Sequence, residues 1–354
     1  MFAAVILIGA ALLMLPISAQ ERTVTPFHEA LFTATSAVCV TGLVVRDTAS
    51  HWSAFGQAVL MVLIQIGGLG VITVGASFSL LSGRRISLSQ RGRMQEAMSA
   101  PKVGGIVRLT GFVIRASLMI EGIGALCMLP VFCRDFGVSG IWKAVFHSVS
   151  AFCNAGFDLM GTPDTPFVSL TAYRADPVIN LTISALIVVG GIGFLTWDDV
   201  RTNRLCFHRY RLQSKVILAA TALLILLPML YFFCFEFKGG ALRERLLLSL
   251  FQSVTPRTAG FNTADYTSLS SSGRGLTILL MFIGGSSGST AGGIKTTTAA
   301  VLVANAFAVF RRQKSPEMFG RRMEEKAVHD AAAIFTLYLV LSLTGAFVIS
   351  TVET

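Results

Sequence analysis

"AVFHSVSAFCNAGF", residues 144–157, has two related copies in this chain. They are "ALFTATSAVCVTGL" at 30–43 and "SLFQSVTPRTAGF" at 249–261. Each copy has a short helix-like run, then small polar residues, then a glycine followed by Leu or Phe. Such a run is too short to cross a bilayer and suits a re-entrant helix. The shared glycine recurs about a hundred residues apart, as Gly42, Gly156 and Gly260.

The composition around these stretches is typical of a membrane protein. The 354 residues are 53% hydrophobic and 14% charged, whereas a soluble domain carries about 25% charged residues. Apolar runs of transmembrane length recur, which predicts an all-α polytopic membrane protein. These runs lie near 2–18, 57–82, 107–133, 177–197, 214–236, 275–310 and 327–352.

The short stretches and the apolar runs combine into one repeated unit. Each short stretch is followed by a span that opens alike: "QIGGLGVIT" at 65–73, "VVGGIGFLT" at 188–196 and "FIGGSSGST" at 282–290. The unit is therefore a span, a re-entrant pore loop and a second span. We expect repeats at 1–83, 107–200 and 213–311, with 327–354 as the first span of a truncated fourth repeat.

The basic residues indicate the orientation in the membrane. They gather in the loops after the second, fourth and sixth spans, which the positive-inside rule makes cytoplasmic, together with the N-terminus. The net charge of +10 is then mainly a topology signal and does not indicate nucleic-acid binding. Contact with anionic membrane lipids is a secondary role of this charge. The residues are Arg84, Arg85, Arg91, Arg93, Lys102, Arg201, Arg204, Arg209, Arg211, Arg311, Arg312, Lys314, Arg321 and Arg322.

Span–loop–span units around an axis are the plan of a potassium-type pore, in which backbone carbonyls replace the hydration shell of the ion. Glycine supplies the backbone freedom that such loops need. A single loop glycine would carry no function, but three in one repeat context predict a selectivity filter. The expected filter residues are Val40, Thr41, Gly42, Asn154, Ala155, Gly156, Thr258, Ala259 and Gly260.

The third repeat carries a polar stretch, 284–298, inside an apolar segment. Its glycines and β-branched residues disfavour a continuous helix, and an irregular loop at this depth is tolerated where it faces an aqueous cavity. We expect a gate below the filter, although a passive packing kink is the alternative. Its residues are Gly284, Gly285, Ser286, Ser287, Gly288, Ser289, Thr290, Ala291, Gly292, Gly293 and Lys295, whose charge would disfavour cation passage.

"SAVCVTGL", "SAFCNAGFDLMG", "SVTPRTAGFNT" and "GGSSGSTAGGIKTTT" resemble the Trk/Ktr/HKT superfamily of potassium transporters, and most closely the bacterial Ktr/Trk pore-forming subunit. The resemblance implies a pseudo-fourfold pore for K⁺ uptake across a bacterial cytoplasmic (inner) membrane, with Na⁺ as an activator in some members. It also implies a homodimer, a cytoplasmic ring of nucleotide-binding regulatory subunits and an intramembrane gate at 284–298.

The resemblance stops short of a fourth pore loop, so a non-conducting fragment of the family is one alternative. A carrier with broken helices is another. We find no His, Asp or Glu cluster for an enzyme, a metal site or a cofactor. Glu121 and Arg115, within the third span, have a functional role as the default hypothesis, with a snorkelling arginine and a carboxylate satisfied by a neighbouring helix as the alternative. Asp198 and Asp199 are expected to cap a solvated cytoplasmic helix end. Asn154 and Asn262, beside the filter glycines, are expected to form loop hydrogen bonds, with scaffolding of the ion site as the alternative.

Overall fold

The computed structural model describes residues 2–70, 74, 88–97, 104–204, 206–313 and 315–352. Within these ranges the chain consists of helices joined by loops, with one two-stranded antiparallel hairpin, β1 (Glu317–Met318) and β2 (Arg321–Arg322). Three described helices are long and apolar enough to cross a membrane, and a fourth span is formed if one bent pair is counted. The predicted all-α polytopic membrane fold is therefore confirmed. Arg84, Arg85, Lys102, Lys314 and most of 70–83 lie outside the described residues.

The segment predicted as the first repeat contains, in chain order, α1 (Phe2–Leu13), η1 (Pro16–Ser18), α2 (Phe27–Val38), α3 (Thr48–His51) and α4 (Ala54–Leu69). The α2 helix is the short helix expected before Gly42. The Ser53 hydroxyl accepts a hydrogen bond from the Gly56 N–H (3.3 Å), so it caps the start of α4. At the other end, Gly70 adopts φ 83° and stops the helix. A separate helix, α6 (Leu88–Ala97), precedes the second repeat.

The segment predicted as the second repeat contains α7 (Ile106–Phe136), α8 (Ser139–Phe152), η2 (Thr171–Tyr173), α9 (Pro177–Gly191) and α10 (Phe194–Asn203). Asp176 caps α9 by accepting from the Val178 and Ile179 N–H groups (2.9 and 3.0 Å). The apolar segment at 177–197 is not one continuous helix, because α9 and α10 meet at 96°. Gly193 supplies the φ of 89° that this break requires.

After η3 (Phe207–Arg209), the segment predicted as the third repeat contains α11 (Leu212–Tyr231), the π-helical turn η4 (Phe232–Glu236), α12 (Leu242–Val254), η5 (Tyr266–Ser268), α13 (Ser271–Phe282) and α14 (Thr296–Phe310). The closing span is interrupted between α13 and α14, where the sequence predicts a break. After the β1–β2 hairpin the chain continues as α15 (Glu325–Val352), which packs against α14.

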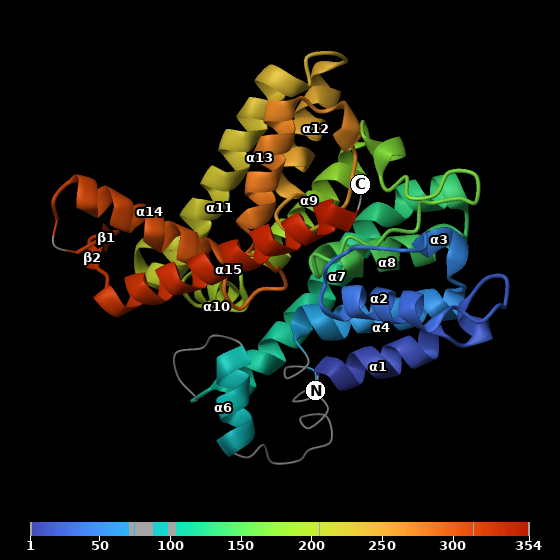
Figure 1. Cartoon of the computed structure of the whole chain (residues 1–354), viewed down its shortest axis with the longest axis horizontal. Helices are drawn as coiled ribbons and strands as arrows, with labels where there is room; N and C mark the ends of the chain where they lie inside the picture. The colour runs from blue at the N-terminus through green and yellow to red at the C-terminus, as the bar shows by residue number, and fades with distance from the viewer. Residues whose placement is uncertain are drawn as a thin grey trace.

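The repeats pack against one another in sequence order. The closing helix of each repeat contacts the short helix of the next, since α4 packs on α8 and α9 packs on α12. Figure 1 shows the resulting arrangement, with the first repeat (blue) and the third repeat (yellow to orange) on either side of α7, α8 and α9.

The packing inside a repeat depends on the first glycine of each Gly-Gly pair. A Cβ built on Gly67 would lie 2.2 Å from the Val38 carbonyl oxygen, and one on Gly190 would lie 2.0 Å from the Phe152 oxygen. Only glycine allows the closing helix to come this close to the end of its own short helix.

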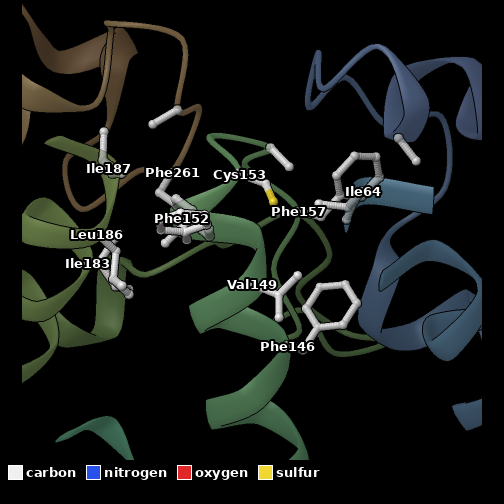
Figure 2. Packing of buried hydrophobic residues seen from close by; sticks show 14 of the residues in the cluster. Ile64, Phe146, Val149, Phe152, Cys153, Phe157, Ile183, Leu186, Ile187 and Phe261 are labelled. Carbon is white, nitrogen blue, oxygen red and sulfur yellow. The ribbon is translucent and has the colours of Figure 1, made fainter. Parts of the chain in front are cut away.

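The core lies around α8. Figure 2 shows Phe152 between Ile183 and Leu186 of α9 on one side and Ile64 of α4 on the other, with Phe261 of the third repeat beside it. Large apolar side chains also lie exposed along the outer face of α7, as a lipid-facing surface requires: Leu118, Met119, Ile123 and Leu126.

Candidate functional site

Each short helix ends in a loop of unusual backbone conformation. The residue two before each repeat glycine is left-handed although it carries a side chain: Val40 (φ 55°), Asn154 (φ 57°) and Thr258 (φ 67°). The glycines are left-handed as well: Gly42 (φ 81°), Gly156 (φ 71°) and Gly260 (φ 89°). The residue between is not left-handed in any of the three loops. Non-glycine residues in this region are uncommon and concentrate at functional sites.

The three loops meet in space. A Cβ built on Gly42 would lie 2.5 Å from the Ala155 carbonyl oxygen, and one on Gly156 would lie 2.4 Å from the Ala259 oxygen. A Cβ on Gly260 would lie 3.4 Å from the Cα of Gly156. The second and third loops therefore each present a backbone carbonyl beside the glycine of the preceding loop. The structure brings together residues of all three predicted filter segments.

The short helices hold these loops through their last turns. The Ser150 hydroxyl donates to the Phe157 carbonyl (2.7 Å), and the Thr255 hydroxyl donates to the Phe261 carbonyl (2.6 Å). The Ala155 N–H also donates to the Ser150 carbonyl (2.8 Å). Because both hydroxyls are fully buried, these bonds fix the loop backbone against the helix end.

A cavity of about 130 Å³ opens where the loops meet, and all three repeat glycines line it together with Asp47 and Asp158. We call it the vestibule. Asp47 is held in place by the Ser50 and Phe167 N–H groups (2.8 and 3.0 Å). Burial raises the pKa of the Asp158 carboxyl to about 6, and the charge of Asp47 adds to this rise. The vestibule therefore carries a carboxylate that titrates near neutral pH.

The polar stretch after α13 forms a closed loop, Ile283–Lys295, which we call the intramembrane loop. Its two ends pair with each other: the Gly284 N–H donates to the Ile294 carbonyl (3.0 Å), and the Gly285 N–H donates to the Gly292 carbonyl (3.2 Å). Lys295 donates through Nζ to the Ala291 carbonyl (2.8 Å). The backbone groups that leave the helix are thus largely satisfied within the loop itself, as its depth in the membrane requires.

The intramembrane loop also contacts the second repeat and the filter segments. The Ser286 N–H donates to the Gly191 carbonyl (2.9 Å), and the Thr290 hydroxyl donates to the Phe152 carbonyl at the end of α8 (3.0 Å). The Gly292 N–H donates to the Thr258 hydroxyl (3.2 Å). The loop therefore lies directly against two of the three converging segments.

Arg257 is a residue of this site that sequence reasoning passed over. It precedes Thr258, its exposed fraction is 7%, and its Nη2 donates to the Gly284 carbonyl (3.4 Å). Its Nε has no hydrogen-bond partner, and no carboxylate pairs with it among the described residues. A single arginine at membrane depth in "TPRTAGF" is the signal that could have identified it.

The ionisable residues of the third span have separate environments. Glu121 is buried and accepts from the Gln65 amide of α4 (2.9 Å), while Arg115 is exposed. The side-chain Oε1 of Gln65 accepts a hydrogen bond from the Cys153 thiol at 3.8 Å. Glu121 thus connects α7 with α4 and with the residue before Asn154. Gln65 was not singled out in the sequence, because its partner lies 56 residues away.

The expectation for Asp198 and Asp199 needs adjustment, whereas Asn262 forms a loop hydrogen bond as expected. Asp198 and Asp199 lie within α10 and not at its end, and Asp199 accepts from the Arg211 N–H (3.1 Å) and the Ser214 hydroxyl (2.5 Å). They therefore hold the start of α11. The Asn262 N–H donates to the Ser169 hydroxyl (3.0 Å), which is a loop-structuring role.

Short helices that end in converging backbone loops, within a helical membrane protein, define a membrane transport protein. The comparisons agree. A family model described as the cation transport protein TrkH matches residues 2–354. The chain belongs to this TrkH family of cation transport proteins, so it is a transporter and not an enzyme.

Several characterised proteins are similar over the whole chain. The potassium/sodium uptake protein NtpJ of Enterococcus hirae is 42% identical over 100% of this chain and 78% of its own length. The Ktr system potassium uptake protein B of Bacillus subtilis is 40% identical over 98% of this chain and 78% of its own length. The crystal structure of the potassium transporter TrkH from Vibrio parahaemolyticus has the same fold, with a TM-score of 0.72 at 18% identity over 97% of this chain and 70% of that one.

Proposed function

We propose that this protein takes up K⁺ through a pore whose selectivity filter is the three converging loops. The observation that carries the proposal is the close approach of Gly42 and Gly156 to a carbonyl of the next loop, which lies 2.5 and 2.4 Å from a Cβ built on each glycine. Carbonyls held at one axis by left-handed residues can replace the hydration shell of a monovalent cation. The printed functions of the relatives, potassium and potassium/sodium uptake, support the same ion.

The intramembrane loop is proposed as the gate. It contacts the filter through Thr258 and Arg257 and the end of α8 through Phe152. A displacement of the loop would break these three hydrogen bonds, so loop position and filter conformation are coupled. Lys295, whose Nζ is bonded within the loop, would move with it and reduce cation passage when the loop is in place.

The remaining assignments follow the resemblance and the charge pattern. We propose a homodimer with a cytoplasmic nucleotide-binding regulatory ring, located in a bacterial cytoplasmic membrane with the N-terminus inside. The names "Ktr system" and "uptake protein" of the relatives support a system of several subunits. Na⁺ acts in this proposal as an activator and not as the main cargo.

Ion flux into liposomes tests the proposal. The product of the whole gene is reconstituted, and K⁺ and Na⁺ fluxes are measured at equal driving force, with empty liposomes and with the Gly156→Ser variant as controls. Selective K⁺ flux that the variant loses is the expected result. A flux coupled in fixed ratio to H⁺ or Na⁺ would instead favour a carrier with broken helices, and no flux in any condition would overturn the pore proposal.

A further inference from the structure

A cavity of about 650 Å³ lies at the end of α7 that is remote from the vestibule. It is formed by the first two turns of α7, by α10 and by the start of α11. This volume falls within the range of small-molecule sites. None of the filter or gate residues line it.

The polar part of the cavity is cationic. Arg108, Arg201 and Arg211 line it, with Asp198 as the one carboxylate among its lining residues. Arg211 pairs with Asp198 at 3.1 Å. Arg108 and Arg201 form no salt bridge with any described residue. The cavity therefore carries about two uncompensated positive charges.

The remaining wall of the cavity is apolar and continues into the membrane. Leu109 and Phe112 line it from α7, and the Arg201 guanidinium lies over the Phe112 ring at 4.6 Å. From Ile106 to Phe112 the helix rises about 9 Å. The cavity thus begins at the arginines, at the membrane surface, and extends along side chains that belong to the apolar span.

We infer that this cavity binds an anionic phospholipid, with the phosphate on Arg108 and Arg201 and the acyl chains along Leu109 and Phe112. Guanidinium groups bind phosphate oxygens well. The start of α7, which has no side-chain cap, adds a favourable helix dipole. A soluble anion or an acidic protein segment would use the arginines but would gain little from the apolar wall beside them, so the combination favours a lipid.

The test is a lipid titration of the purified full-length protein in neutral detergent, in which the Tm of the protein is measured at each lipid concentration. Phosphatidylglycerol, phosphatidylcholine and inorganic phosphate are compared. We expect a saturable rise of Tm with phosphatidylglycerol only. In the double variant R108Q/R201Q, about thirtyfold more phosphatidylglycerol should be needed for half of this rise. This factor follows because each arginine contributes about 1 kcal/mol to the binding free energy.

The matched control is R204Q/R209Q, which removes the same charge from neighbouring arginines that do not line the cavity. It should respond as the unaltered protein does. The single variant R108Q, which changes one exposed side chain, covers the case in which the double variant does not fold, and should need about fivefold more lipid.

Three results would overturn the inference. One is an equal response of R108Q and the unaltered protein to phosphatidylglycerol. The second is a response to phosphatidylcholine of the same size, which would mean general lipid solvation. The third is a full rise of Tm with inorganic phosphate, or with an acidic peptide at equal concentration, in place of phosphatidylglycerol. Such a rise would make the occupant a soluble anion or a protein.

Discussion

At the scale of single residues, the strained backbone of the three loops is the main feature. Val40, Asn154 and Thr258 each hold a left-handed conformation that costs a side-chain-bearing residue about 1–3 kcal/mol. Each is followed by a residue that is not left-handed and then by a left-handed glycine. Such alternation turns successive carbonyls toward the same side, which an extended strand cannot do. The cost is therefore understandable if the carbonyls bind an ion.

The repeat glycines should respond unequally to substitution. An added Cβ at Gly156 meets the Ala259 oxygen at 2.4 Å, whereas at Gly260 its nearest atom is 3.4 Å away. We expect Gly156→Ala to lower K⁺/Na⁺ selectivity by about tenfold or more, since a displaced carbonyl costs at least ~1.4 kcal/mol of binding discrimination. Gly260→Ala should have a smaller effect. Bi-ionic flux in liposomes measures both.

Gly275→Ala is the control for these variants, because an added Cβ at Gly275 of α13 meets nothing within 4 Å. It should leave the selectivity unchanged. Equal selectivity in Gly156→Ala and Gly275→Ala would remove the filter assignment.

Asp158 predicts a pH dependence of K⁺ uptake. Its pKa is raised to about 6, so the carboxyl is neutral below this pH and negative above it. As external pH falls through about 6, the vestibule loses one negative charge, and the apparent K⁺ affinity should fall about threefold. The factor corresponds to the loss of a Coulomb attraction of ~0.6 kcal/mol, the value for unit charges ~7 Å apart in water. Uptake rates at varied K⁺ between pH 5 and 8 measure this change.

In the Asp158→Asn variant the low affinity should be present at every pH in this range. Asp164→Asn, on the same loop but outside the vestibule lining, serves as the control and should keep the pH dependence. A pH dependence that survives in Asp158→Asn would assign the titration to another group.

At the scale of elements, the intramembrane loop is held by contacts that join distant parts of the chain. Thr290 bonds to Phe152, which is 138 residues away, and Arg257 bonds to Gly284, which is 27 residues away. The break between α13 and α14 is predictable from sequence because glycine and β-branched residues act locally. The contacts are not, because no local pattern encodes which carbonyl lies opposite a given hydroxyl.

The rest of the site also contains features that the sequence predicts and features that it does not. The short helices and the glycines Gly42, Gly156 and Gly260 follow from periodicity and repeat spacing. The 96° bend between α9 and α10 and the burial of Arg257 do not, since both depend on tertiary packing.

Thr290→Val tests one of these contacts without changing the size of the side chain. It removes the donor to the Phe152 carbonyl, which is buried, at a cost of about 1–1.5 kcal/mol. If this bond stabilises the closed position, flux without the regulatory signal should rise about five- to tenfold. Ser289→Ala, which removes only bonds within the loop, one to the Ser286 carbonyl and one from the Ala291 N–H, should leave basal flux unchanged. Equal basal flux in both variants would contradict the contact's role.

Deletion of Ser286–Ala291 tests the gate as a whole. The residues that would be joined, Gly285 and Gly292, are already hydrogen-bonded to each other at 3.2 Å, so the shortened chain can close. K⁺ flux should rise and lose much of its dependence on the regulatory nucleotide, while K⁺/Na⁺ selectivity changes much less, because the filter loops stay intact. Flux that remains low and nucleotide-dependent in liposomes would rule out the gate.

At the scale of the whole molecule, the orientation in the membrane connects the proposed filter with the direction of uptake. The vestibule has to face outward and the loop between α10 and α11 inward. The helix count alone does not establish this. The α9 helix has 15 residues and rises about 22 Å, less than the ~30 Å hydrocarbon core, and α10 then turns away by 96°.

Thiol labelling in intact cells determines the orientation. Asp164 is exposed in the loop that follows the vestibule segment, and Cys206 is exposed between α10 and α11. With Cys39, Cys127 and Cys234 replaced by Ser, a membrane-impermeant maleimide should label Asp164→Cys from outside. It should label Cys206 only after the cells are permeabilised, which also proves that the thiol is reactive. The reverse pattern would turn the vestibule, and with it the carboxylate of Asp158, toward the cytoplasm. Its pH response would then follow internal pH, so the two measurements check each other.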